Sequence, residues 1–266
     1  MTRQGRLRLT LLVVLLLTLL RLPVALAMRA LLPDLSVSPA ANYAASIAQS
    51  LLMFALPGWL LKPEWRRSPT QGRDGFVWAL LTIVAVVAVR GAVTPLNELW
   101  SRALGLENAG IPMTEGLPGR VLMLLALVIV PAVAEEIFFR GTLQPRLLMC
   151  CSRWQALLLS TLLFALMHGS LAGLPGHLLI SLLLSLLMMH TGRLSVTIGA
   201  HMVYNALALY WPDEAALLNV GCVLLSCVIV AWLLLRLPRG RERRMARSEG
   251  LFCAVILLIM AAQYLI

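Results

Sequence analysis

The sequence predicts an all-α membrane protein, a polytopic bundle of about 8–9 transmembrane helices with its N-terminus in the cytoplasm. Three observations support this fold class. The 266 residues are 60% hydrophobic and only 13% charged. Their mean hydropathy of +0.88 lies outside the range of water-soluble globular domains. The apolar residues form long unbroken runs, without the alternation of barrel strands, and lipid offers the backbone no hydrogen bonds, so the spanning segments must be helices.

Nine apolar segments reach or approach the length of a spanning helix, about 20 residues at 1.5 Å rise each. In order they are residues 9–28, 41–61, 75–94, 120–140, 154–172, 176–190, 194–211, 216–236 and 251–266. The segment 120–140 is expected to continue past Arg140 to a turn near Cys151. Breaker clusters at 173–176 and 191–193 bound the short segment 176–190, which we expect to lie among other helices.

The basic residues predict the orientation of the chain. With a cytoplasmic N-terminus, 17 of the 22 Lys and Arg residues fall in inside segments, 4 fall in outside segments, and Arg21 lies in the first span. This asymmetry is typical of membrane topology and not of a nucleic-acid surface, so we expect no nucleic-acid partner. The run ending in Ala25-Leu26-Ala27 also fits a cleavable signal, which would leave eight spans. Arg21 and Pro23 interrupt that run and favour a retained helix.

The chain has no internal repeat and is interpreted as one domain with three parts. These are N-terminal membrane helices in 1–119, a helical core in 120–211 and C-terminal membrane helices in 212–266. The cysteines lack the paired spacing of a zinc site and are expected to be small buried apolar residues. They are Cys150, Cys151, Cys222, Cys227 and Cys253.

Two acidic residues, Glu135 and Glu136, directly follow an apolar run, where ionisable groups are costly and usually functional. Pro131 lies four residues before Glu135 and is expected to kink the helix so that the carboxylate faces a cavity. An ion pair between Glu136 and Arg140 at a helix end would explain Glu136 alone. Glu135 lies about 100° further around the helix and needs a different partner.

Two of the four histidines lie deep in apolar segments. His168 ends the run from Thr161 to Met167, and His201 is followed by Asn205 one turn further on the same face. Counting about 1.5 Å per residue from the turns places Glu135, His168 and His201 in one layer of the membrane. His177 and His190 lie near the ends of the short helix, where the expected role is that of an interfacial ring.

These residue types permit hydrolysis. In our interpretation Glu135 takes the proton from an attacking water, His168 holds that water, and His201 with Asn205 stabilises the tetrahedral oxygen. No cofactor is then required. The alternative is a catalytic zinc ion bound by Glu135, His168 and His201, although the chain lacks the H-E-x-x-H motif.

Three strings of this sequence resemble the motifs of a known family. They are Glu135-Glu136-Ile137-Phe138-Phe139-Arg140-Gly141, Phe164-Ala165-Leu166-Met167-His168 and His201-Met202-Val203-Tyr204-Asn205. The resemblance is to the CAAX protease and bacteriocin-processing (CPBP, Abi) family of intramembrane endopeptidases, and it covers roughly 120–211. It implies a glutamic-type protease with Glu135 as the catalytic carboxylate and Glu136 and Arg140 in support. It also implies that His168, His201 and Asn205 complete the site.

The expected partners are a protein or peptide substrate at the membrane and the lipid bilayer itself. The bias of Arg over Lys and the absence of an endoplasmic-reticulum retention signal favour a bacterial inner (plasma) membrane. Two other classes of protein stay open. A non-catalytic scaffold or immunity protein would tolerate loss of Glu135, and a transporter would use Glu135 and the histidines as a proton relay.

Overall fold

The computed structural model describes residues 1–31, 38–64, 75–106, 114, 116–212, 216–238 and 245–264. In these residues the secondary structure is helical and contains no strand, which confirms the predicted all-α class. Each of the nine predicted apolar segments overlaps a helix, although α8 ends at Met167, before the predicted end of the segment 154–172, and residues 265–266 of the last segment lie outside the described residues. The composition favours helices, because in a helix the backbone groups of an apolar segment form hydrogen bonds with one another where no water is present.

The elements follow one another as single helices or as helices interrupted by short π-helical turns, marked η. In chain order they are α1 (Arg3–Leu31), α2 (Pro39–Ser50), η2 (Leu51–Ala55), α3 (Leu56–Leu60), α4 (Gly75–Leu104), α5 (Leu117–Leu124), η3 (Leu125–Ile129), α6 (Val130–Phe138), η4 (Phe139–Leu143), α7 (Gln144–Cys150), α8 (Arg153–Met167), α9 (Leu174–Thr191), α10 (Leu194–Tyr210), α11 (Ala216–Leu235) and α12 (Arg247–Ala262).

Among the described residues, five continuous helical stretches are long and apolar enough to cross a membrane. They are Pro39–Leu60, Gly75–Leu104, Leu117–Cys150, Leu174–Thr191 and Ala216–Leu235, and α8 and α10 are shorter apolar helices. Many large apolar side chains face outward, including Leu217 (91% exposed) and Leu235 (88% exposed) on α11. Such a surface requires an apolar solvent, so the chain is a multi-pass membrane protein.

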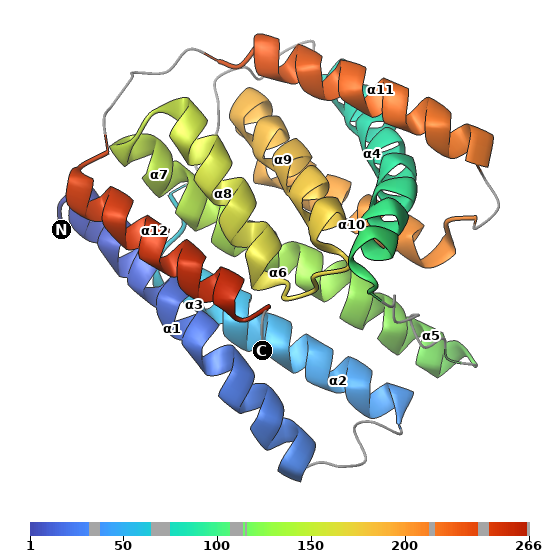
Figure 1. Ribbon diagram of the computed structural model, residues 1–266, viewed down its shortest axis with the longest axis horizontal. Coiled ribbons are helices and arrows are strands. Elements are labelled where there is room, and N and C mark those ends of the chain that lie inside the picture. The colour runs from blue at the N-terminus through green and yellow to red at the C-terminus, as the bar shows by residue number, and fades with distance from the viewer. Residues whose placement is uncertain are drawn as a thin grey trace.

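The helices are arranged around α9, which packs against α8 on one side and α4 on the other (Figure 1). Its buried share, 56%, is the largest of the five candidate spans, which confirms the predicted position among other helices. The helix ends at Gly192, whose φ of 61° lies in the left-handed region that glycine adopts without strain. Outside this centre, α11 packs on α4, and α1 and α12 lie side by side (Figure 1).

Three π turns share a sequence signal that hydropathy does not reveal. Each of η2, η3 and η4 ends two residues before a proline, namely Pro57, Pro131 and Pro145. A proline ring clashes with the carbonyl four residues earlier and has no N–H to donate, and a π turn is one way to relieve both conflicts. The disturbance expected from Pro131 therefore takes the form of a π turn just before the acidic pair.

Helix α1 is part of the core. Leu7, Leu11 and Val14 are fully buried, and Arg8 forms an ion pair of 2.7 Å with Glu249 on α12. Removal of α1 at Ala25-Leu26-Ala27, which lies within the helix, would therefore expose this apolar face.

Candidate active site

The acidic pair lies in the middle of the long helical stretch Leu117–Cys150, which continues to a turn at Cys151 as the depth estimate assumed. The predicted ion pair is formed: Arg140 Nη1 donates to Glu136 Oε1 at 2.8 Å, and both side chains are 0% exposed. Arg140 Nη2 also donates to the carbonyl and hydroxyl oxygens of Ser181 on α9, each at 3.0 Å. The pair lies in the centre of the bundle and not at a helix end, so that part of the expectation is wrong.

Glu135 points to a different set of partners, as its position on the helix requires. Its Oε2 atom lies 3.5 Å from His168 Nε2 and 4.0 Å from His201 Nε2. The carboxylate is 6% exposed, and Oε2 has no hydrogen-bond partner among the described residues. The three groups that the depth estimate placed in one layer therefore meet, and a carboxylate oxygen is left available to a water or a substrate.

Both imidazoles are held through Nδ1, so that Nε2 faces Glu135. His168 Nδ1 lies 2.9 Å from the carbonyl oxygen of Phe164, and His201 Nδ1 lies 3.2 Å from Glu136 Oε1. A carbonyl or a carboxylate can only accept, so Nδ1 carries the proton in both rings. In the neutral form, each Nε2 is then an acceptor that faces the Glu135 carboxylate.

Phe164 organises this cluster through its ring as well as its carbonyl. The ring centroid lies 4.6 Å from that of His168 and 5.8 Å from that of His201. The Arg140 guanidinium lies 4.4 Å from the same centroid. One aromatic side chain thus touches both imidazoles and the cation that pairs with Glu136.

These groups form the wall of a cavity of about 380 Å³. Helix α10 contributes Asn205 and Tyr204 to the wall beside His201. The π turns η2 and η3 contribute the apolar side chains Met53, Phe54, Ala126 and Leu127, and α2 contributes the polar side chains Ser46, Gln49 and Ser50. The cavity therefore combines a polar cluster with an apolar surface that suits an uncharged or aliphatic chain segment.

The expected interfacial role of His177 is wrong. Its ring stacks on His168 at a centroid distance of 4.2 Å and an angle of 25°, and it lines the same cavity. Helical periodicity locates His177 near the start of α9 but does not show that this turn of α9 packs on the end of α8. His190, at the other end of α9, contacts Trp78 and Trp232, which is consistent with an aromatic cluster near the membrane interface.

Arg21 is a second residue whose role the sequence did not reveal. Its Nη1 donates to the Met167 carbonyl at 3.2 Å and its Nη2 to the His168 carbonyl at 2.9 Å. These carbonyls belong to the end of α8, where helix geometry leaves them without partners, and a cation is favourable there. Gly169 follows with φ 61°, and a Cβ there would collide with the Arg21 guanidinium. The available signal was an arginine inside an apolar run.

The zinc alternative can be compared with this geometry. Ligand atoms about 2.0–2.1 Å from a tetrahedral zinc lie about 3.3 Å from one another. Glu135 Oε2 lies 4.0 Å from His201 Nε2, and among the described residues no three His, Cys, Asp or Glu side chains form a group spaced for a metal. The spacing accommodates a water molecule among the three groups, and a zinc ion would require the side chains to move closer together.

Comparison with known families gives one match. Residues 117–207, about a third of the 266 residues, match the model described as "Type II CAAX prenyl endopeptidase Rce1-like". The matched segment runs from the start of α5 into α10 and contains all three motif strings, so the resemblance stated from the motifs is confirmed. The match indicates a membrane protease of the CAAX type. No curated protein and no solved structure shows a significant match to the chain.

Proposed function

From the membership of residues 117–207 in the type II CAAX prenyl endopeptidase family, we propose that the protein is a glutamic-type intramembrane endopeptidase. It hydrolyses a peptide bond of a membrane-associated or lipidated protein or peptide. The observation that carries the proposal is the buried Glu135 carboxylate facing two anchored imidazoles at the wall of a cavity.

Glu135 and His168 activate the water. A water between Glu135 Oε2 and His168 Nε2 has two acceptors for its two protons, because His168 Nδ1 is committed to the Phe164 carbonyl. Its lone pair then points away from both groups and toward the substrate carbonyl. As the oxygen attacks, its proton passes to Glu135, which later delivers it to the leaving amine.

His201 and Asn205 stabilise the tetrahedral oxygen. His201 Nδ1–H is donated to Glu136, so Nε2 is a donor only when the ring is an imidazolium. The Glu136 carboxylate orients the ring so that Nε2 faces Glu135, as the aspartate of a hydrolytic triad orients its histidine. Asn205 lies one turn further along α10 at the cavity wall and supplies an uncharged donor. Glu136 and Arg140 are positioning residues in this scheme.

The substrate reaches the site from within the membrane. The apolar wall formed by η2 and η3 accommodates aliphatic side chains, and the family's description points to prenylated substrates that end in a CAAX motif. The excess of Arg over Lys among the basic residues suits the inner membrane of a bacterium as the location.

The test compares Glu135→Gln with wild type in lipid vesicles. The probe is a fluorescent peptide ending in Cys-aliphatic-aliphatic-X, presented with and without a farnesyl group on the cysteine. The matched control is Glu98→Gln, which removes a half-exposed carboxylate that pairs with Arg102. We expect wild type and Glu98→Gln to release the C-terminal fragment and Glu135→Gln to release none.

Three further outcomes separate the alternatives. Cleavage by Glu135→Gln at the wild-type rate would end the proposal. If wild type cleaves neither form, new C-terminal peptides in the membrane proteome of expressing cells decide between a different substrate and a non-catalytic scaffold. Loss of activity to a chelator, with recovery on addition of zinc, would assign Glu135, His168 and His201 as metal ligands.

A further inference from the structure

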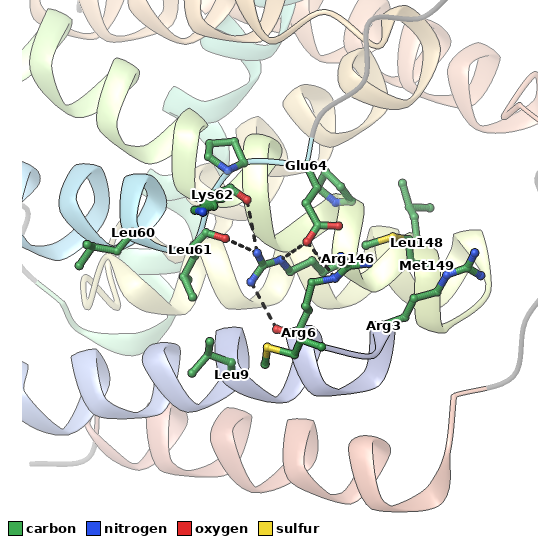
Figure 2. Close-up of a pocket in the computed structure, with 13 residues that line it drawn as sticks. Arg3, Arg6, Leu9, Leu60, Leu61, Lys62, Glu64, Arg146, Leu148 and Met149 are labelled. Carbon is green, nitrogen blue, oxygen red and sulfur yellow. Dashed lines mark hydrogen bonds and ion pairs between the residues drawn. The ribbon is translucent and has the colours of Figure 1, made fainter.

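A second cavity, of about 1130 Å³, lies at the end of the bundle where α1 begins (Figure 2). Its walls come from the first turns of α1, the end of α3 with the residues that follow it, and α7. It shares no lining residue with the cavity at Glu135. Arg146, at its base, is eleven residues beyond Glu135, about 16 Å along the same helical stretch. The two cavities are therefore separate sites.

The lining of this cavity carries more positive than negative charge. Among the described residues that line it, the cationic side chains are Arg3, Arg6, Lys62 and Arg146, and the one carboxylate is Glu64. Glu64 Oε1 contacts both Arg6 Nε, at 3.3 Å, and Arg146 Nε, at 3.0 Å. Because a single carboxylate serves two guanidinium groups, the cavity has an uncompensated positive charge.

The Arg146 side chain is a buried part of the cavity wall, held in place by several hydrogen bonds. It is 3% exposed and donates to Thr10 Oγ1 at 2.6 Å and to the carbonyl oxygens of Leu61 and Lys62. Lys62 adopts a φ of 58°, the left-handed region that lysine normally avoids. This conformation costs free energy and persists because the surrounding contacts, here the two carbonyls on Arg146, hold it. The chain thus fixes Lys62 beside the cavity.

The start of α1 adds to the positive potential. The N-terminal end of a helix carries a partial positive charge and is normally complemented by acidic residues. The first turn of α1 has none and carries Arg3 instead. Arg8, the next basic residue after Arg6, is directed away to Glu249 on α12. An anion in the cavity would be stabilised by the side chains and by the helix end together.

Apolar side chains line another part of the same cavity. Leu9 is 40% exposed and Leu60 is 61% exposed, and Leu148 and Met149 complete this part of the wall. Figure 2 shows the apolar and the cationic side chains around one space. A ligand that matches both parts is amphiphilic, with an anionic head and an apolar tail.

We propose that this cavity binds the phosphate headgroup of an anionic phospholipid, with Arg3, Arg6 and Lys62 as its ligands and the exposed leucines against its acyl chains. An excess of basic residues is predicted for this side of the membrane, and such an excess is typical of the cytoplasmic side. The cytoplasmic leaflet is also where anionic lipids are found. The lipid binds at the membrane surface, away from the hydrolytic site, and holds α1, α3 and α7 together.

The test removes two exposed cations without touching the buried framework. The full chain is purified as wild type, as Arg3→Gln/Lys62→Gln, and as the control Arg236→Gln/Arg247→Gln. The control removes two exposed arginines at the ends of α11 and α12 that do not line the cavity. Native mass spectrometry during titration with phosphatidylglycerol, and separately with phosphatidylcholine, gives the affinity for each lipid.

Wild type and the control are expected to bind one phosphatidylglycerol in preference to phosphatidylcholine, and Arg3→Gln/Lys62→Gln to bind it about 30-fold more weakly. If the double variant does not fold, the single variants are each expected to lose about fivefold. Equal affinity of wild type and the cavity variants would overturn the proposal, as would an equal loss in the control. Displacement of the lipid by millimolar inorganic phosphate alone would show a free-phosphate site, and displacement by an acidic peptide would show a peptide site. Either result would overturn the lipid assignment.

Discussion

Removal of Arg140 tests the buried ion pair most directly. Substitution by Met keeps an unbranched side chain, shorter than that of Arg, and leaves Glu136, which is 0% exposed, without its cation. It also removes the donor to the carbonyl and hydroxyl oxygens of Ser181. Breaking a buried pair by removal of one partner costs about 3–5 kcal/mol. We expect Arg140→Met to lower the free energy of unfolding by that amount, measured by sodium dodecyl sulfate titration of the purified protein in mixed micelles.

The double variant Glu136→Gln/Arg140→Met separates stability from activity. It removes the buried carboxylate that Arg140→Met leaves without its cation, so its stability is expected to return to within about 1–2 kcal/mol of wild type. Peptidase activity is not expected to return, because His201 Nδ1 has lost the carboxylate that orients the ring. An Arg140→Met protein as stable as wild type would refute the ion-pair reasoning. Full activity in the double variant would refute the positioning role of Glu136.

Substitutions at three further positions test other contacts. Gly91→Ala on α4 would place a Cβ 2.6 Å from Cys222 Cβ on α11, so we expect a loss of about 1–3 kcal/mol in unfolding free energy by the same titration. Gly169→Ala forces alanine into the left-handed region and displaces Arg21 from the end of α8. We expect a lower melting temperature and a lower turnover, and values equal to wild type would contradict this account. His177→Phe keeps a ring against His168 and should retain turnover, whereas His177→Ala should lower it about tenfold. Equal loss in both would indicate a chemical role for the imidazole.

The fold could be predicted because the membrane restricts the choices. Apolar runs of spanning length can only be helices, and breakers such as those around 174–191 mark where each helix ends. The rise per residue, counted from the turns between helices, then sufficed to bring Glu135, His168 and His201 to one level. Hydropathy did not show the three π turns, because a one-residue widening of the backbone leaves the apolar pattern almost unchanged.

The site could be predicted only where local sequence carries its own signal. The acidic pair stands out because carboxylates are costly in an apolar run, and the Glu136–Arg140 pair follows from i,i+4 spacing. The stacking of His177 on His168 depends on how the start of α9 meets the end of α8, which no local pattern encodes. The anchoring of His201 by Glu136 likewise depends on contacts between different helices.

The arrangement around α8 shows that the matched segment does not complete its own active site. Donors from outside residues 117–207 reach the last carbonyls of α8. Arg21 on α1 donates to the carbonyls of Met167 and His168. The Tyr264 hydroxyl donates at 3.1 Å to the carbonyl of Leu166, which also accepts from the Gly169 N–H. The two flanking segments are themselves linked, since Gln263 donates to the Thr18 carbonyl at 2.8 Å. His168 is the residue at which α8 ends, so the position of its ring depends on this terminus. Helix α1 and the residues that follow α12 therefore fix the end of α8 that carries His168, the residue proposed to bind the water, a role that the division into core and flanking helices does not reveal.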